Sequence, residues 1–171
     1  MKCVVRFETD DGIFSAIFND NGLAELSFPD RPCRVRAADD APKEWQRDTA
    51  AALECVLRGE QPDRLPPLDL SRGTPFQQEV WRALLEIPAG ETRSYGEIAA
   101  RVGEPGAARA VGAACGANPI PVLVPCHRVL AAHKKLGGFS SGLKWKRLLL
   151  EREARRAGIE FKLSMGNSVA A

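Results

Sequence analysis

The stretch "YGEIAARVGEPGAARAVGAACGA", residues 95–117, decides how the second half of the chain is expected to fold. Residues 95–102 have the apolar spacing of a short helix. The GEPG that follows, residues 103–106, is a sharp turn, and residues 107–117 predict a second helix. Two helices joined by a glycine-containing turn make a helix-turn-helix, so we expect this arrangement at the centre of the C-terminal half.

The second of these helices consists almost entirely of small residues, with Arg109 as its single cation. Close packing inside a core is the ordinary use of such a helix. The alternative is that its narrow face approaches a nucleic-acid groove and Arg109 enters the base stack. Helices that read the major groove carry Arg, Asn or Gln at several positions, and this one does not. Any DNA contact made here should therefore depend little on base sequence.

The N-terminal part predicts a small antiparallel sheet and one helix. Short apolar runs at residues 4–8, 13–18 and 22–28 are typical of strands, and the Asn-Asp-Asn-Gly at 19–22 indicates a hairpin turn. Residues 42–58 have helical spacing, from Pro42 to a stop at Gly59. The proline-rich segment that follows is interpreted as a connector between two parts of the chain.

The remaining elements complete an α+β prediction. Thr74-Pro75 is a good helix start, residues 120–124 are expected to form a short buried strand or extended segment, and residues 143–156 a last helix. The tail from Ser164 should be loose. We thus expect an N-terminal α/β subdomain with its connector at 1–70, a second domain at 71–158, and a tail at 159–171.

Composition excludes several classes of protein. The chain of 171 residues is 44% hydrophobic and 27% charged, as in ordinary globular proteins. No apolar run is long enough to cross a membrane, and the N-terminus turns acidic too soon for a secretory signal. Five cysteines without framework spacing favour reduced thiols. We expect a monomer without membrane contact, in a bacterial or archaeal cytosol or, in a eukaryote, the nucleus.

Charge is distributed unevenly along the chain. Residues 1–70 contain 9 Lys and Arg against 14 Asp and Glu, whereas residues 71–150 contain 11 against 5, a net charge of +6. A basic segment can bind a polyanion, because clustered cations attract phosphate backbones. It can equally be a solvated basic face, and charge alone does not distinguish the two.

A second informative stretch is "PIPVLVPCHRV", residues 119–129. It places His127 and Arg128 directly after Cys126, whereas a cysteine that only fills a core needs no such neighbours. Zinc ligands favour paired spacings such as C-x2-C, which are missing, so we expect no metal. No cofactor site is visible in the sequence either, so we expect no cofactor. A nucleophilic cysteine activated by an imidazole fits better. The base would need a carboxylate, for which the last helix offers Glu151 and Glu153.

These motifs together resemble a known family. PCHRV, preceded by Asn118 and followed by GGFSSG and an LLxxE helix, is similar to the signature of the O6-alkylguanine-DNA alkyltransferases, and TPFQQEVW, IPAGETRSYGEIA and ARAVG extend the resemblance over residues 73–155. The resemblance implies a ribonuclease H-like N-terminal subdomain and a winged helix-turn-helix. It also implies repair of double-stranded DNA through the minor groove, with little sequence specificity.

The roles of individual residues follow from the resemblance alone. Cys126 corresponds to the alkyl acceptor, His127 to a base acting through water, and Glu153 to the carboxylate that orients it. Asn118 braces the active-site turn, and Tyr95 assists departure of guanine. The implied DNA contacts are Arg109, Ala108, Ala110, Gly112 and the loop lysines Lys134 and Lys135, and the implied contacts with the base are Tyr95, Val129, Ser140 and Lys146.

The implied reaction takes the alkyl group from O6 of a flipped guanine, and possible activity on O4-methylthymine stays open. The nucleotide must leave the duplex because the alkyl group cannot be reached inside it. Arg109 would fill the space that the flipped nucleotide leaves in the base stack. The thioether formed on Cys126 would be irreversible, so each chain would repair one lesion. Two departures stand out: Leu130–Lys135 replaces a glycine-containing turn, and Phe139 stands where tyrosine is common.

Three other functions stay open at this point. A DNA-binding regulator could use the helix-turn-helix without chemistry, although PCHRV and Glu153 would then have no purpose. A cysteine hydrolase would need an oxyanion-hole glycine motif, and none is evident. The non-catalytic lesion-binding branch of the family replaces the cysteine, which Cys126 argues against.

Overall fold

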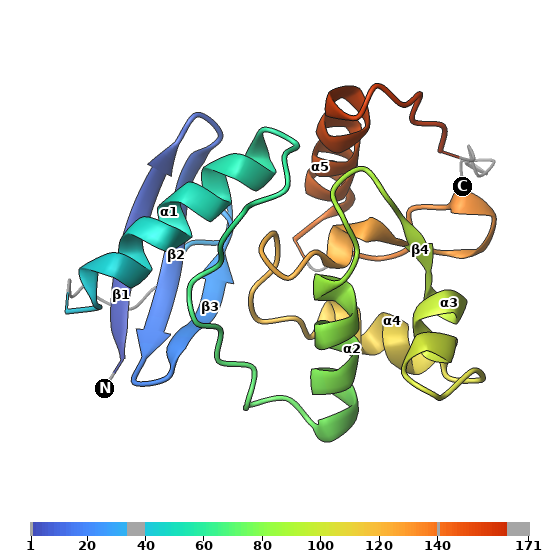
Figure 1. The fold of residues 1–171 in the computed structure, drawn as a ribbon, viewed down its shortest axis with the longest axis horizontal. Helices are drawn as coiled ribbons and strands as arrows, with labels where there is room; N and C mark the ends of the chain where they lie inside the picture. Colours follow the sequence, from blue (N-terminus) through green and yellow to red (C-terminus); the bar gives the residue numbers. More distant parts are fainter. Residues whose placement is uncertain (1, 34–39, 140, 164–171) are drawn as a thin grey trace.

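The structure, a computed structural model, describes residues 2–33, 40–139 and 141–163 (Figure 1). It is an α+β fold, as predicted. The strands are β1 (Cys3–Thr9), β2 (Gly12–Asn19), β3 (Gly22–Ser27), β4 (Arg93–Ser94) and β5 (Val129–Leu130). The helices are α1 (Lys43–Leu57), α2 (Pro75–Leu85), α3 (Tyr95–Arg101), α4 (Ala108–Gly116) and α5 (Leu143–Arg156), with single 3₁₀ turns at η1 (Cys126–Arg128) and η2 (Ala132–Lys134).

The predicted N-terminal sheet is confirmed, with antiparallel strands in the order β1-β2-β3. Asn19 pairs with Gly22 across a two-residue turn, and Gly22 adopts a φ of 141° that other residues rarely reach. Five consecutive residues of β2, from Phe14 to Phe18, are buried. Because successive side chains of a strand point to opposite faces, both faces of the sheet must be covered at β2.

Aromatic side chains from two helices cover the sheet. Trp45 of α1 stacks on Phe18, with 6.5 Å between the ring centroids. Trp145, near the start of α5, packs against Phe28 and Phe14 at 4.8 and 5.7 Å. The helix that precedes the connector and the last helix of the chain therefore both pack on the sheet, and Figure 1 shows α5 close to the junction of the two halves.

The C-terminal half is helical and begins where predicted. Thr74 caps α2 in a reciprocal capping box with Gln77. Helices α3 and α4 lie on either side of a turn in which Gly103 has a φ of 81°. The indole N–H of the buried Trp81 donates to the carbonyl of Ala114 at 2.8 Å, which ties α2 to α4.

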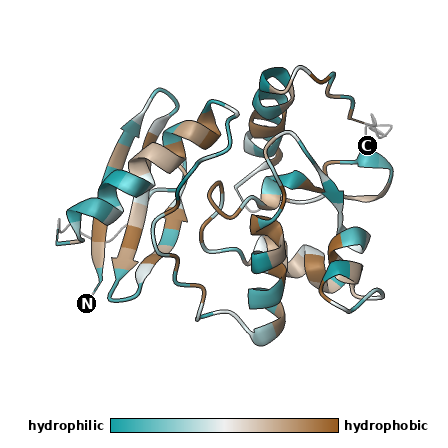
Figure 2. Cartoon of the chain, in the orientation of Figure 1, coloured by the Kyte–Doolittle hydropathy of each residue, from teal (hydrophilic) through white to brown (hydrophobic). Residues whose placement is uncertain are grey.

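The expected strand or extended segment at residues 120–124 is wrong. These residues form consecutive turns, and Val122 has a φ of 76°. The side chain of Asn118 explains the difference: it accepts from the N–H of Ile120 at 3.0 Å and donates to the carbonyl of Val124 at 2.8 Å. The segment is nevertheless buried, and Figure 2 shows a hydrophobic loop between the sheet and α2. Its apolar residues serve the core without strand pairing.

The C-terminal helix α5 has the predicted bounds. The tail expected to be loose from Ser164 lies outside the described residues. No helix in the described ranges combines the length and apolar character required to cross a bilayer.

Candidate active site

Cys126 begins the 3₁₀ turn η1, directly after the buried turns of residues 118–125. The side chain of Asn118 bonds to two backbone groups of these turns, the N–H of Ile120 and the carbonyl of Val124, and its role as a brace of the active site stays a prediction. Cys126 is 2% exposed and lines a cavity of about 760 Å³ in the C-terminal half. A nearly buried sulfur on a cavity wall can meet a ligand in the cavity while remaining shielded from bulk water.

The imidazole of His127 lies fully buried against Glu153 of α5, with 2.7 Å between Nε2 and Oε1. Burial disfavours the charged form and lowers the pKa of His127, although Glu153 opposes this effect. Burial also acts to raise the pKa of Glu153, but hydrogen bonds from His127 and Arg128 lower it to about 2. An ionised carboxylate can only accept, so Nε2–H of a neutral imidazole donates to it. Nδ1 is then left as a proton acceptor, and it is buried without a hydrogen-bond partner among the described residues.

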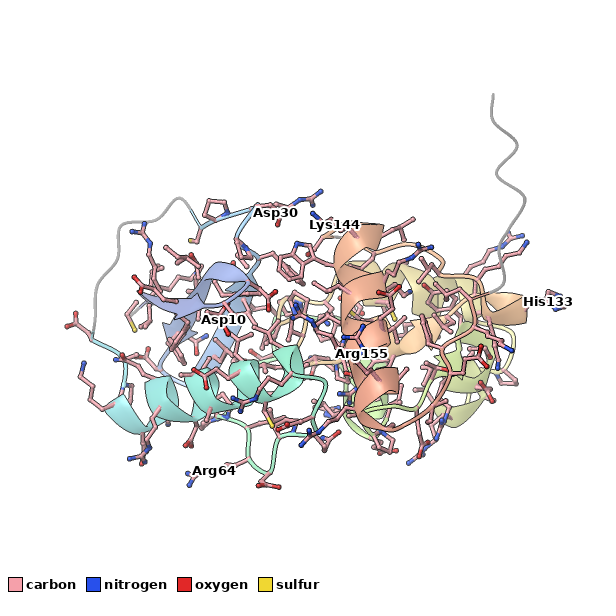
Figure 3. The ribbon with its side chains drawn as sticks, turned by 90° about the horizontal axis from the view of Figure 1, so that it is seen from above. Asp10, Asp30, Arg64, His133, Lys144 and Arg155 are labelled. Atoms are coloured by element: carbon pink, nitrogen blue, oxygen red, sulfur yellow. The ribbon has the colours of Figure 1, made fainter. Side chains whose placement is uncertain are left out.

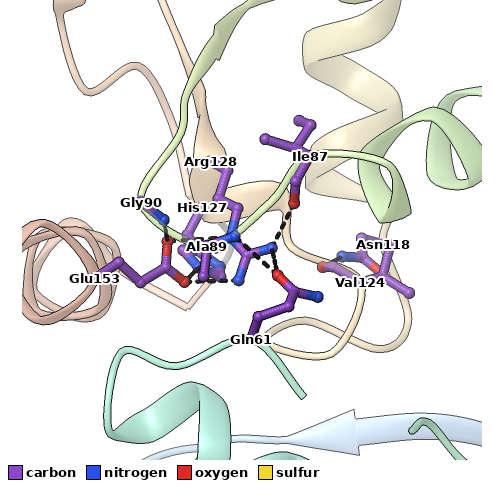
Figure 4. Close-up of polar contacts among 9 residues, drawn as sticks. All are labelled: Gln61, Ile87, Ala89, Gly90, Asn118, Val124, His127, Arg128 and Glu153. Carbon is purple, nitrogen blue, oxygen red and sulfur yellow. Dashed lines mark hydrogen bonds and ion pairs between the residues drawn. The ribbon is translucent and has the colours of Figure 1, made fainter. Parts of the chain in front are cut away.

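Arg128 supplies the positive charge that a buried carboxylate requires. Its Nη2 lies 2.9 Å from Oε1 of Glu153, its Nε lies 3.1 Å from both carboxylate oxygens, and its Nη1 donates to the carbonyl of Ile87 at 2.6 Å. The backbone N–H of Gly90 is 3.4 Å from Oε2 (Figure 4). Glu153 thus receives hydrogen bonds from two segments of the chain, η1 and the loop after α2, and Figure 4 shows their convergence.

The surroundings of Cys126 favour its neutral thiol. Burial raises the pKa of its thiol to about 11, while Asn118 and Lys146 act in the opposite direction. The cation that favours the thiolate is therefore Lys146, because the guanidinium of Arg128 is committed to Glu153. The resting sulfur is a protonated thiol at neutral pH. It needs a proton acceptor at the moment of reaction, and the neutral imidazole of His127 is suited to that role.

The cavity collects five of the predicted site residues: Tyr95, Ala108, Arg109, Gly112 and Cys126. Burial raises the pKa of Tyr95 to about 12, so its phenol stays protonated and can donate a hydrogen bond. Phe139 also lines the cavity, and Cys115 was not predicted there. Cys115 lies on α4, eleven positions before Cys126, so only the fold brings it to the same cavity.

The other described residues predicted to contact DNA or the guanine do not line this cavity. Ala110, Lys134 and Lys135 are exposed, as a DNA contact would require. In Figure 3 the neighbouring His133 projects from the outer end of this half, where η2 lies. Val129 is buried in β5, where it pairs with Arg93. Ser140 lies outside the described residues. For all of these, contact with DNA or the base remains a prediction.

Lys146 is fully buried beside two residues that line the cavity, Tyr95 and Gly138. Its ammonium lies 5.8 Å from the ring centroid of Tyr95 and 3.3 Å from the carbonyl of Gly138. Burial lowers its pKa to about 8, although Cys126 and Cys115 act to raise it. From this position the ammonium of Lys146 can act electrostatically on the sulfur of Cys126. A direct contact between Lys146 and the guanine stays a prediction.

Among the described residues, no three His, Cys, Asp or Glu side chains cluster closely enough to hold a metal ion. The sequence also indicates that Cys3, Cys33 and Cys55 are structural or incidental; they lie in the N-terminal half, with Cys3 buried and Cys33 and Cys55 half-buried.

Comparison with known proteins supports the same chemistry. Residues 75–155 match the sequence model of the 6-O-methylguanine DNA methyltransferase DNA-binding domain. A methylated-DNA–protein-cysteine methyltransferase of Mycobacterium tuberculosis is 57% identical over 111 residues, which are 65% of this chain and 67% of that protein. One from Methanosarcina acetivorans is 41% identical over 152 residues, covering 86% of this chain and 95% of that protein.

Solved structures agree over nearly the whole chain. The crystal structure of Mycobacterium tuberculosis OGT in complex with DNA superposes with a TM-score of 0.75 and 43% identity, covering 88% of this chain and 92% of that one. The O6-methylguanine-DNA methyltransferase of the archaeon Pyrococcus kodakaraensis gives a TM-score of 0.62 at 25% identity, covering 90% and 99%. The chain belongs to the methylated-DNA–protein-cysteine methyltransferase family.

Proposed function

We propose that this protein repairs alkylated DNA directly, by moving the alkyl group of O6-alkylguanine onto its own Cys126. The observation that carries the proposal is a buried Cys126 at the wall of a cavity large enough for a nucleobase, followed directly in the chain by a buried His127 whose Nε2 lies 2.7 Å from Oε1 of Glu153. A regulator that only binds DNA would gain nothing from a buried imidazole whose second nitrogen has no partner in the described residues.

The transfer proceeds in one displacement. His127 takes the thiol proton of Cys126 on Nδ1 through a bridging water, and the sulfur attacks the alkyl carbon. The bond between that carbon and O6 of guanine breaks, and the electron pair leaves with the base. Glu153 stabilises the imidazolium that forms, as the carboxylate of a nucleophile–histidine–carboxylate triad does. Tyr95, still protonated, donates a hydrogen bond that helps the guanine anion to leave.

The same proposal accounts for the small residues of α4. With α3 as its partner in a helix-turn-helix and the β4–β5 ladder and following loop as the wing, α4 approaches the minor groove by its narrow face. Arg109 is exposed and lines the mouth of the cavity, a position from which it can replace a flipped nucleotide. Lys134 and Lys135 contact phosphates, which position the protein without reading sequence. One monomer binds one lesion.

The division of the chain follows from this assignment. We assign DNA binding and chemistry to residues 71–158, the sheet, α1 and the connector to a subdomain at 1–70, and residues 159–171 to a tail. The order of three antiparallel strands followed by a helix is compatible with a ribonuclease H-like subdomain.

Transfer should be stoichiometric. Incubation with a duplex that contains O6-methylguanine should add one methyl group per chain, on the peptide that contains Cys126, because the thioether has no route back to a thiol. Intact-protein and peptide mass spectrometry measure this directly, with unmodified duplex and Cys126→Ser as controls. Loss of more methyl groups from DNA than there are chains would contradict the proposal.

Substitutions at the base and its carboxylate should separate activation from binding. His127→Ala should slow transfer by on the order of 100-fold or more, since it removes the general base, while lesion binding changes little. Glu153→Gln should also slow transfer, and it should destabilise the fold by about 3–5 kcal/mol because Arg128 is left buried without its counter-charge. Glu151→Gln is the matched control, because Glu151 lies exposed on the same helix and should change neither quantity. Single-turnover rates measure the effect on transfer, and urea denaturation measures the effect on stability. Equal effects at Glu151 and Glu153 would refute the assignment of Glu153 as the partner of His127.

Arg109 should matter only when a nucleotide has to be flipped. Arg109→Ala should slow repair of duplex DNA strongly and repair of free O6-methylguanine base very little. Arg109→Lys should restore little, because an ammonium lacks the planar guanidinium that can stack. Single-turnover rates on both substrates, with melting temperatures of each variant, test this. Equal loss on base and duplex would exclude the proposed role.

A further inference from the structure

The helix that carries Glu153 is anchored to the N-terminal half through the preceding residue. The guanidinium of Arg152 binds Asp11, in the turn between β1 and β2, through two parallel hydrogen bonds of 2.7 and 2.8 Å. Its Nη1 also donates to the carbonyl of Leu57, the last residue of α1, at 2.9 Å. The pair is largely shielded from water, with 29% of the Arg152 and 17% of the Asp11 side chain exposed. Such a bidentate, partly buried pair fixes geometry better than an exposed ion pair does.

Gly59 contacts the same point of α5 through its backbone. It has a φ of 79°, and a Cβ there would lie 2.4 Å from the carbonyl oxygen of Arg152 and 2.9 Å from the nitrogen of Glu153. Any other residue at position 59 would clash with the backbone of α5, so the chain after α1 packs directly against Arg152 and Glu153.

The connector reaches the other side of the carboxylate. The amide oxygen of Gln61 accepts from the N–H of Ala89 at 2.8 Å and lies 3.4 Å from Nη1 of Arg128 (Figure 4). Ala89 precedes Gly90, which donates to Glu153, and Arg128 is the counter-charge of Glu153. Gln61 therefore contacts two of the segments that surround the carboxylate.

We infer that the N-terminal half is a positioning device for the catalytic carboxylate, with Asp11 as a positioning residue that acts through Arg152 on Glu153. Consecutive helix residues point about 100° apart, so holding Arg152 toward the sheet sets the rotation at which Glu153 meets His127. An error of about 1 Å in such a contact can reduce a rate on the order of 100-fold. The inference rests on the proposed alkyl transfer, since it concerns the rate of that reaction.

The test is Asp11→Asn, which keeps the shape of the side chain and removes its charge. We measure the single-turnover rate constant for methyl transfer from an O6-methylguanine duplex, the final number of methyl groups per chain, and lesion binding. The rate constant should fall on the order of tenfold, while the end point stays at one methyl per chain and binding is unchanged. Asp11→Glu, which can rebuild the ion pair, should recover most of the rate. Arg152→Lys, which keeps the charge and loses the paired geometry, is a second variant should Asp11→Asn not fold.

Two controls distinguish positioning from a loss of stability. Asp48→Asn breaks the 2.9 Å ion pair with Arg64, which lies within the N-terminal half, and should leave the rate constant unchanged. Because Asp11 acts through Glu153 and Glu153 through His127, adding Asp11→Asn to His127→Ala should slow transfer no further.

The outcomes are separable. Asp11→Asn at the wild-type rate, or Asp48→Asn as slow as Asp11→Asn, would overturn the positioning role while leaving the proposed function intact. A further loss in the double variant would overturn it as well. Wild-type protein that accepts no methyl group would overturn the proposed function itself, and the positioning role with it.

Discussion

The buried carboxylate of Glu153 is the interaction on which the rest of the site depends. It lies 1% exposed, in surroundings where a lone charge would be very costly. Arg128 makes its ionisation possible, His127 uses it as an acceptor, and Gly90 completes its hydrogen bonding. If any of these partners were lost, the charge would be under-compensated and the imidazole would lose its orientation. One side chain thus connects the last helix, the cysteine turn and the loop after α2.

The state of the nucleophile follows from this arrangement. A thiol with a pKa near 11 is nearly unreactive toward dissolved electrophiles, because the thiolate is the reactive form. That property suits a protein whose nucleophile can be used once. In the proposed reaction, the sulfur reacts only when a guanine occupies the cavity and the thiol proton can pass to His127. Lys146 eases this step, since its buried ammonium favours the developing thiolate.

Local signals in the sequence predict the elements well, because the positions that end them act locally. Gly59 ends α1 through its positive φ, Thr74 caps α2, and the Asn-Gly turn closes β2 on β3. The error at residues 120–124 has a physical cause: an apolar run looks alike whether it pairs as a strand or is folded into turns by one asparagine. The resemblance assigned Cys126, His127 and Glu153. It did not show that Arg128 is the partner of the carboxylate, that Gln61 contacts Arg128, or that Asp11 binds Arg152, since those contacts span 25 to 141 positions of the chain.

The protonation state of His127 tests the central claim most directly. Nitrogen-15 NMR of histidine-labelled protein reports the charge and tautomer of each imidazole, and a His133→Gln variant leaves a single imidazole with its two ring nitrogens, because the chain has two histidines. At neutral pH we expect a neutral ring with its proton on Nε2, which donates to Glu153, and a bare Nδ1. An imidazolium at neutral pH, protonated on both nitrogens beside a Cys126 thiolate, would contradict the account.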